Sequence, residues 1–197
     1  MKNYNPNLYW NDYDDYWPFT SPNLPSFESV LFYPGFVLFE GTNISEGRGT
    51  TLPFQMIGAP FVKDPSKLIK RVKDYLSKDE GYHLKEAFFK PTFNKWAGEL
   101  CGGAQLILED KHKLRSYELA LCFLKSFMDL YEKDFEWKQP PYEYEYENLP
   151  IHLILGSNKI EESLKKEGPF GSFWKFGLES YQKKAKEILI YERKFEF

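Results

Sequence analysis

The stretch VLFYPGFVLFEGTNISEGRGTTLPFQMIGAPFV, residues 30–62, holds the signals that decide how this chain folds. Its first part, VLFYPGFVLF (30–39), is apolar and β-prone with one break at Pro34-Gly35, which predicts two short strands or one bent strand. The next part, FEGTNISEGRGT (39–50), holds three glycines and no apolar period, so it predicts a loop. The last part, PFQMIGAPFV (53–62), predicts irregular structure.

A helix and two strands are predicted directly after this stretch. Asp64-Pro65 is typical of a helix start, and apolar residues recur at helical spacing from Leu68 to Leu76. Residues 82–93 and 104–110 read as strands, joined by the glycine-rich NKWAGELCGG (94–103). A long loop between two strands indicates a functional loop.

The second half of the chain predicts mostly helices. The longest begins with Ser116 as its cap and runs to about residue 133; short helices follow at 150–156 and 157–167, and a last one at 173–188 precedes a strand-like ILIY (188–191). The segment PPYEYEYEN (140–148) fits an edge strand or a solvated loop. Because helices and strands do not alternate regularly, the class is α+β: one small mixed or antiparallel sheet packed by about four helices.

The length of 197 residues fits one domain. Residues 1–29 are rich in Asn, Asp, Tyr and Pro, which predicts an extended arm whose aromatic side chains lie against a surface. The domain proper is then residues 30–197.

Composition removes several partner classes. With 26 basic and 29 acidic residues, the net charge of −3 gives no basic field for nucleic acid or anionic lipid. No apolar run reaches the roughly 18 residues of a membrane span, and the first residues lack the order of an export signal. The two cysteines lie at no metal-ligand spacing from a histidine and the glycine loop is no P-loop, so we expect neither metal nor cofactor.

The loop after residue 39 is the first candidate site. It carries two carboxylates and one guanidinium, with glycines that let backbone approach a ligand. The alternative is a tight connection in which Thr42, Asn43 and Ser45 satisfy loop backbone while Arg48 pairs with a neighbouring carboxylate. The candidate residues here are Glu40, Asn43, Ser45, Glu46 and Arg48.

The second candidate is WAGELCGG (96–103). Glu99 fits a general acid, a nucleophile or an acceptor for a sugar hydroxyl, or else a structural hydrogen bond to loop amides. Cys101 fits a nucleophile only with a histidine nearby, and otherwise a small packed side chain. Trp96 fits a sugar-stacking platform or a core residue.

Three strings carry a resemblance to a known family. SPNLPSFESVLFYPGFVLFEGTNISEGRGTTLPFQMIGAPFV (21–62), FKPTFNKWAGELCGGAQL (89–106) and ESYQKKAKEILIY (179–191) are similar to the C-terminal domain of the exo-β-N-acetylmuramidase (NamZ) family, from about Tyr9 to Tyr191. The resemblance implies a bacterial glycoside hydrolase that releases N-acetylmuramic acid from the non-reducing end of peptidoglycan fragments. It further implies a periplasmic or secreted setting.

Family members resemble one another in having a Rossmann-like N-terminal domain before this segment, with the active site in the cleft between the two. This sequence begins close to where the second domain would begin, so we expect a separately encoded N-terminal half, a fragment or a decayed gene. The resemblance places the principal catalytic carboxylate on that half, so the chain is expected to need it for catalysis.

On the matching strings, Glu40 and Glu99 are the expected catalytic carboxylates of this half, because glycoside hydrolysis usually uses two. Arg48 is expected to bind the lactyl carboxylate of the muramic acid. Further expected substrate-binding residues are Thr42, Asn43, Ser45, Glu46 and Gln55. The alternatives are a noncatalytic glycan- or partner-binding module and a Cys101-dependent acyl transferase.

Overall fold

The computed structural model describes residues 4–13, 16–18, 20–76, 81–170, 175 and 177–193. These form one α+β domain, so the predicted class is confirmed, and its small sheet has three strands. The helices are α1 (Phe27–Phe36), α2 (Pro65–Tyr75), α3 (Ser116–Leu130), α4 (Pro150–Leu155), α5 (Ile160–Glu167) and α6 (Leu178–Ile188), with 3-10 turns η1 (Trp10–Asp12) and η2 (Val37–Gly41). The strands are β1 (Met56–Ala59), β2 (Tyr82–Phe89) and β3 (Cys101–Leu108).

The sheet is antiparallel throughout, in the order β1-β3-β2. Its side chains alternate between two faces, and each face covers a different core. On one face, the main core includes Tyr82, Leu84, Ala104 and Leu106. On the other face, Phe89 and Cys101 form a small second core with Met56, and the partly buried Leu52 and Trp96 pack against it. The loops of residues 47–55 and 90–100 therefore sit over this second core.

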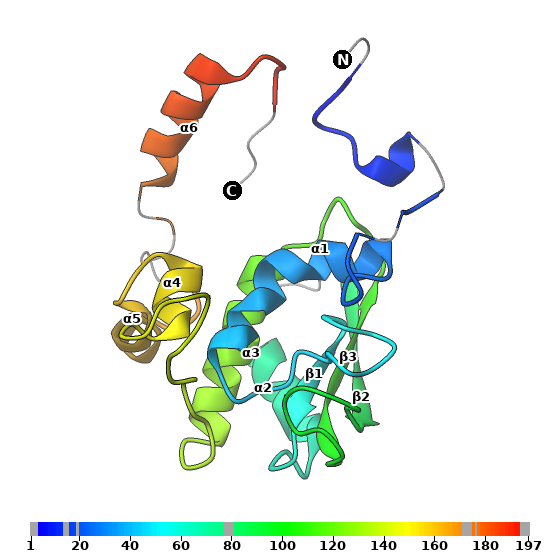
Figure 1. The fold of residues 1–197 in the computed structure, drawn as a ribbon, viewed down its shortest axis with the longest axis vertical. Coiled ribbons are helices and arrows are strands. Elements are labelled where there is room, and N and C mark those ends of the chain that lie inside the picture. The colour runs from blue at the N-terminus through cyan, green and yellow to red at the C-terminus, as the bar shows by residue number, and fades with distance from the viewer. Residues whose placement is uncertain are drawn as a thin grey trace.

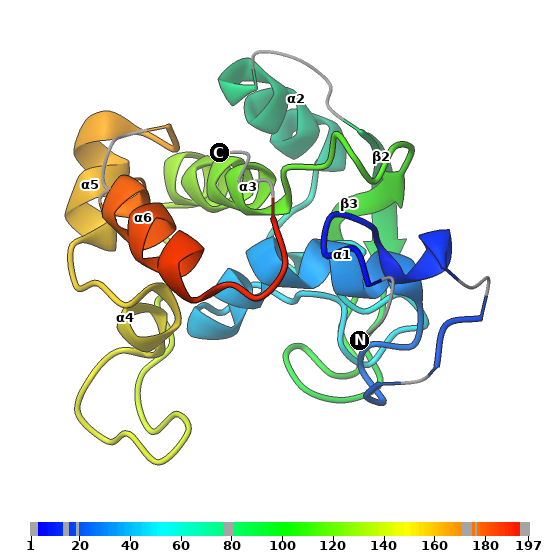
Figure 2. The ribbon, with the colours of Figure 1, turned by 90° about the horizontal axis from the view of Figure 1, so that it is seen from above.

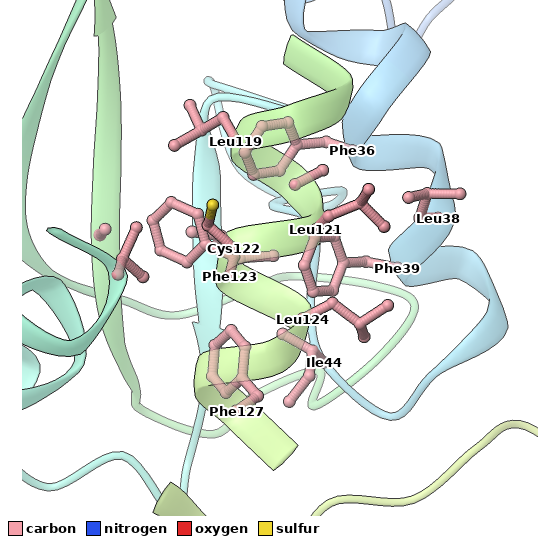
Figure 3. Close-up of a cluster of buried hydrophobic side chains, with 14 of the residues drawn as sticks. Phe36, Leu38, Phe39, Ile44, Leu119, Leu121, Cys122, Phe123, Leu124 and Phe127 are labelled. Atoms are coloured by element: carbon pink, nitrogen blue, oxygen red, sulfur yellow. The ribbon is translucent and has the colours of Figure 1, made fainter. Parts of the chain in front are cut away.

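The main core lies between the sheet and the helices (Figure 1). Helix α3 is its centre, and α1 and η2 bring aromatic side chains against it (Figure 3). The rings of Phe36 and Phe123 are 5.8 Å apart, and those of Phe39 and Phe127 are 6.1 Å apart. All four side chains are fully buried.

The prediction of strands at residues 30–39 is wrong, because this segment forms α1 and η2. The Ser26 side chain caps α1 by accepting a hydrogen bond from the Ser29 amide at 3.2 Å. Pro34 lies in the last turn, where the loss of its N–H removes one hydrogen bond. The helix is apolar on most sides, so it shows no helical period in the sequence.

Several boundaries also differ from the sequence predictions. β1 lies within the segment expected to be irregular, β2 ends at Phe89 and β3 begins at Cys101. The Arg115 residue, not Ser116, occupies the N-cap of α3. Residues 188–191 form no strand, since no neighbouring strand of the described chain offers them a partner. The predicted start of the last helix at residue 173 lies outside the described residues.

The N-terminal arm lies against the loop between β3 and α3. The Tyr9 hydroxyl donates to the Lys111 carbonyl oxygen at 3.2 Å, and the Tyr9 ring meets Phe27 edge to face at 6.2 Å. Closer to the N-terminus, the rings of Tyr4 and Tyr191 are 5.0 Å apart, so the arm also contacts the C-terminal segment. Figures 1 and 2 show the arm and α6 at the same end of the molecule.

Helices α2 and α3 are joined by an ionic cluster on Asp129. This carboxylate accepts hydrogen bonds from Arg71 (Nη2–Oδ2 2.6 Å), the Tyr75 hydroxyl and the Lys125 ammonium. Burial acts to raise the pKa of Asp129, but these three donors outweigh burial and hold the pKa below its usual 3.8. The carboxylate of Asp129 thus binds a proton less tightly in the folded protein than in the unfolded chain.

The stabilising effect of Asp129 is expected to depend on pH. A depressed carboxyl pKa contributes stability above the unfolded value of 3.8, and this is lost as pH falls through the lower folded value. Asp129→Asn should lower the free energy of unfolding by about 1.5 to 3 kcal/mol at pH 6, with the difference shrinking below about pH 4. Urea unfolding of both proteins at a series of pH values measures this difference in the free energy of unfolding. The exposed Asp134→Asn should change stability by less than about 0.5 kcal/mol, and a pH-independent gap would contradict the assignment.

Candidate functional site

The loop that follows η2 is held by its own hydroxyl groups. The Thr42 hydroxyl donates to the Phe39 carbonyl oxygen at 2.9 Å and accepts from the Ile44 amide at 3.1 Å. The Ser45 hydroxyl accepts from the Gly47 amide at 3.2 Å. Both side chains are buried, so their polar groups serve the loop backbone.

Asn43 and Gln55 are also bonded within the chain. The Asn43 side chain donates to the Asp134 carbonyl oxygen at 2.8 Å and accepts from the Glu136 amide at 3.1 Å. The buried Gln55 amide donates to the Ser29 hydroxyl at 3.2 Å. These contacts fix the loop to the segment after α3 and to the start of α1.

Lys95 joins this loop to the β2–β3 loop. Its ammonium donates to Glu46 Oε2 at 2.8 Å and to the carbonyl oxygens of Phe39 and Ile44 at 2.6 and 2.8 Å. Three acceptors match the three N–H groups of an ammonium. Burial lowers the pKa of Lys95, and the adjacent Glu46 carboxylate opposes that shift. Glu46 is 1% exposed, so its charge is balanced inside the protein.

The residues on either side of Lys95 have unusual backbone angles. Asn94 and Trp96 have φ values of 68° and 57°, in a region of backbone conformation that residues other than glycine rarely adopt. The Trp96 indole donates to the Asn43 carbonyl oxygen at 2.6 Å and its ring meets Phe61 edge to face. Trp96 is therefore part of the packing between the two loops.

Glu40, Arg48 and Tyr142 form the accessible polar cluster of this region. Arg48 Nη1 lies 3.3 Å from Glu40 Oε1, and the Tyr142 hydroxyl donates to Glu40 Oε2 at 2.9 Å. The Arg48 and Glu40 side chains are 31% and 18% exposed. Arg48 Nε is buried and has no hydrogen-bond partner in the described part of the chain. Burial, and then the hydrogen bond to Glu40, raise the pKa of Tyr142.

Glu99 is not bonded to this cluster. It is exposed in the β2–β3 loop, and its side chain makes no hydrogen bond or ion pair with the described residues. The structure thus brings Glu40 and Arg48 together, whereas Glu99 shares none of their contacts.

Cys101 does not have the environment of a nucleophile. It is fully buried in the small second core, and burial raises the pKa of its thiol to about 12. A reactive cysteine needs a lowered pKa and access to solvent. The structure gives no support to a Cys101-dependent acyl transferase.

Two residues of the site escape sequence reasoning. Tyr142 lies in the Tyr/Glu segment, 102 residues from its partner Glu40, and nothing in the local pattern links them. Lys95 reads as an ordinary loop lysine, although the apolar residues that surround the glycine-rich segment hint at a packed loop. Within the described ranges, no group of three or more His, Cys, Asp or Glu side chains has the arrangement of a metal site. No described helix has the length and apolar character to span a bilayer.

A family model described as exo-beta-N-acetylmuramidase NamZ, C-terminal, matches residues 31–191. The chain belongs to this NamZ C-terminal family. The resemblance seen in the three sequence strings is confirmed. The peptidoglycan beta-N-acetylmuramidase NamZ of Bacillus subtilis (strain 168) is 39% identical to this NamZ C-terminal chain over an alignment of 183 residues, which covers 91% of the chain and 42% of the relative.

Two crystal structures of DUF1343 family proteins from Bacteroides fragilis NCTC 9343 share the fold of the NamZ C-terminal chain. The first has a TM-score of 0.72 at 21% identity, covering 89% of this chain and 45% of that one. The second has a TM-score of 0.52 at 22% identity, covering 88% and 44%. The NamZ C-terminal chain therefore spans less than half the length of each of these three relatives.

Proposed function

We propose that this NamZ C-terminal chain positions the substrate of a glycoside hydrolase that releases N-acetylmuramic acid from the non-reducing end of peptidoglycan fragments. Its family and the name of its Bacillus relative support this class of substrate. The observation that carries the proposal is the Arg48 side chain, which stays partly exposed on a loop whose neighbouring polar groups are bonded internally.

Arg48 suits the feature that distinguishes muramic acid from most sugars, the carboxylate of its lactyl ether. A guanidinium presents five donors in a planar fork and binds a carboxylate through two parallel hydrogen bonds. In the structure Arg48 uses Nη1 on Glu40, at a long 3.3 Å. Nε is buried, but Nη2 makes no hydrogen bond with the described residues, so Nη2 and the second N–H of Nη1 can donate to a ligand carboxylate.

The remaining predicted site residues take different parts in this proposal. Glycoside hydrolysis needs an acid for the leaving oxygen and a second group for the oxocarbenium-like centre. Glu40 already accepts hydrogen bonds from Arg48 and Tyr142, and it would also accept hydrogen bonds from sugar hydroxyls. The exposed Glu99 would assist the acid/base step. A Rossmann-like N-terminal half would supply the main catalytic carboxylate. Five residues would contribute through the shape of the loop: Thr42, Asn43, Ser45, Glu46 and Gln55.

The proposal is tested by assaying release of N-acetylmuramic acid from a muramyl-glucosamine disaccharide. The assay uses this chain, the N-terminal half of the Bacillus relative, and their mixture. Release only in the mixture supports the proposal, and release by the chain alone would move the main catalytic role to Glu40 or Glu99. Binding without release in the mixture would favour a noncatalytic glycan-binding module, and absence of both would contradict the proposal.

Arg48→Lys is expected to weaken binding of the muramyl disaccharide at least about tenfold, because a lysine cannot form the bidentate pair. Binding of the matching glucosamine disaccharide, which lacks the lactyl carboxylate, should change less than about twofold. Arg71→Lys, on the ionic cluster of α2, is the matched control and should leave both affinities unchanged. Calorimetric or NMR titration measures them, and equal losses on both sugars would refute the role of Arg48.

A further inference from the structure

A half-exposed aromatic side chain lies beside the Arg48 loop. We propose that the Phe93 ring is an apolar platform on which the C–H face of a pyranose ring rests next to Arg48. This subsite rests on the proposed function, because it takes the sugar whose carboxylate Arg48 binds. It extends that function to a residue of the β2–β3 loop.

The backbone fixes Phe93 against the residue that follows Arg48. Thr92 donates to the Gly49 carbonyl oxygen twice, from its amide at 2.8 Å and from its hydroxyl at 2.9 Å. Gly49 has a φ of 83°, and a Cβ added there would lie 2.5 Å from the Phe93 carbonyl oxygen. Only glycine permits this approach, so the two loop segments are locked together at this point.

The exposure of Phe93 contrasts with that of the aromatic residues at the end of β2 and later in the same loop. Phe93 is 52% exposed, whereas Phe89 is buried in the second core and Trp96 is bonded to Asn43. Packing of the second core therefore does not account for the Phe93 ring. A ring kept partly in water on a fixed backbone is a ready contact surface for an apolar ligand face.

A phenylalanine beside an arginine matches the chemistry of a muramyl sugar. The faces of a pyranose ring present C–H groups, and its rim presents hydroxyls and substituents. The Phe93 side chain has no polar group, so it would contact the face of the sugar ring and would form no hydrogen bond with the lactyl carboxylate. Arg48 would recognise that carboxylate, so the two residues should leave different signatures in a comparison of sugars.

The experiment is an NMR titration of the chain, alone and with the N-terminal half of the Bacillus relative, using the muramyl and glucosamine disaccharides. Phe93→Ala should weaken binding of both sugars about tenfold, and Phe93→Tyr should keep affinity within about twofold. The matched control is Phe88→Ala: Phe88 is 57% exposed and lies on the β2 face opposite Phe89. It should change neither affinity.

The outcomes separate this subsite from the proposed function. If Phe93→Ala binds both sugars like the wild type while Arg48→Lys loses the muramyl sugar, the platform is wrong and the function stands. If Phe93→Ala affects the muramyl sugar alone, the platform is also wrong. If the wild-type protein binds neither sugar in either setting, both proposals fail. Thermal unfolding of Phe93→Ala confirms that the variant is folded.

Discussion

Replacing Lys95 with methionine is expected to lower the free energy of unfolding by about 3 to 5 kcal/mol. The substitution removes the ammonium that donates to Glu46 and to two backbone carbonyl oxygens. Because Glu46 is 1% exposed, its carboxylate would be left without a counter-charge in a site that water does not reach. Urea unfolding followed by circular dichroism measures the loss as a lower transition midpoint.

A double-mutant cycle separates the ion pair from the loss of packing. Adding Glu46→Gln to Lys95→Met removes the unpaired charge, so the double variant should be more stable than Lys95→Met alone. The matched control is Lys166→Met, whose pair with Glu162 lies on the surface with side chains 71% and 67% exposed. That change should cost less than about 0.5 kcal/mol. A loss below about 1 kcal/mol for Lys95→Met would show that Glu46 finds other partners.

The second large effect is expected from Gly35→Ala, with a loss of at least about 3 kcal/mol. Gly35 is where α1 crosses the start of α3, and a Cβ there would lie 2.0 Å from the Ser116 carbonyl oxygen and 2.8 Å from the Tyr117 nitrogen. Both atoms are backbone, so no side-chain rotation relieves the clash. The helices would have to separate and open the core around Phe36 and Phe123.

The sign of the change makes Gly35→Ala a sharp test. Alanine favours a helix over glycine by about 1 kcal/mol, so without the close crossing the variant would be more stable than the wild type. The control is Gly156→Ala at the end of α4, where φ is 65° and no atom lies within 4 Å of the added Cβ. There we expect only the cost of a left-handed residue, about 1 kcal/mol. Thermal unfolding compares the three proteins, and an unchanged or higher midpoint for Gly35→Ala would refute the close crossing.

The sequence predicts those elements whose signals are local. Helix α2 has a cap at Asp64, a proline at its first position and one apolar face, and the structure has it at Pro65–Tyr75. Helix α1 shows no such face in its sequence, because apolar residues also occupy its exposed side, where Tyr33 and Pro34 lie, and its apolar run is indistinguishable from a strand. β1 has four buried residues in succession, so it shows no alternation.

The candidate site likewise contains residues that a local pattern predicts and residues that only the fold brings together. Glu40 and Arg48 lie in one stretch of sequence, so the sequence predicts them together, and the structure pairs them. The contacts of Lys95 and Tyr142 depend on segments 49 and 102 residues away, which no local pattern encodes. The internal bonding of Thr42, Asn43 and Ser45 also depends on the fold, since the same residue types suit a ligand site or a tight turn.

The loop around Arg48 takes its partners from later parts of the chain, and this sets the order in which the site forms. Asn43 bonds to Asp134, and Glu40 bonds to Tyr142, both downstream of α3. During synthesis, a chain that has emerged only as far as α2 carries Glu40 and Arg48 without these partners. Contacts over such long sequence separations are slow to close, so the loop around Arg48 is expected to be completed late in folding.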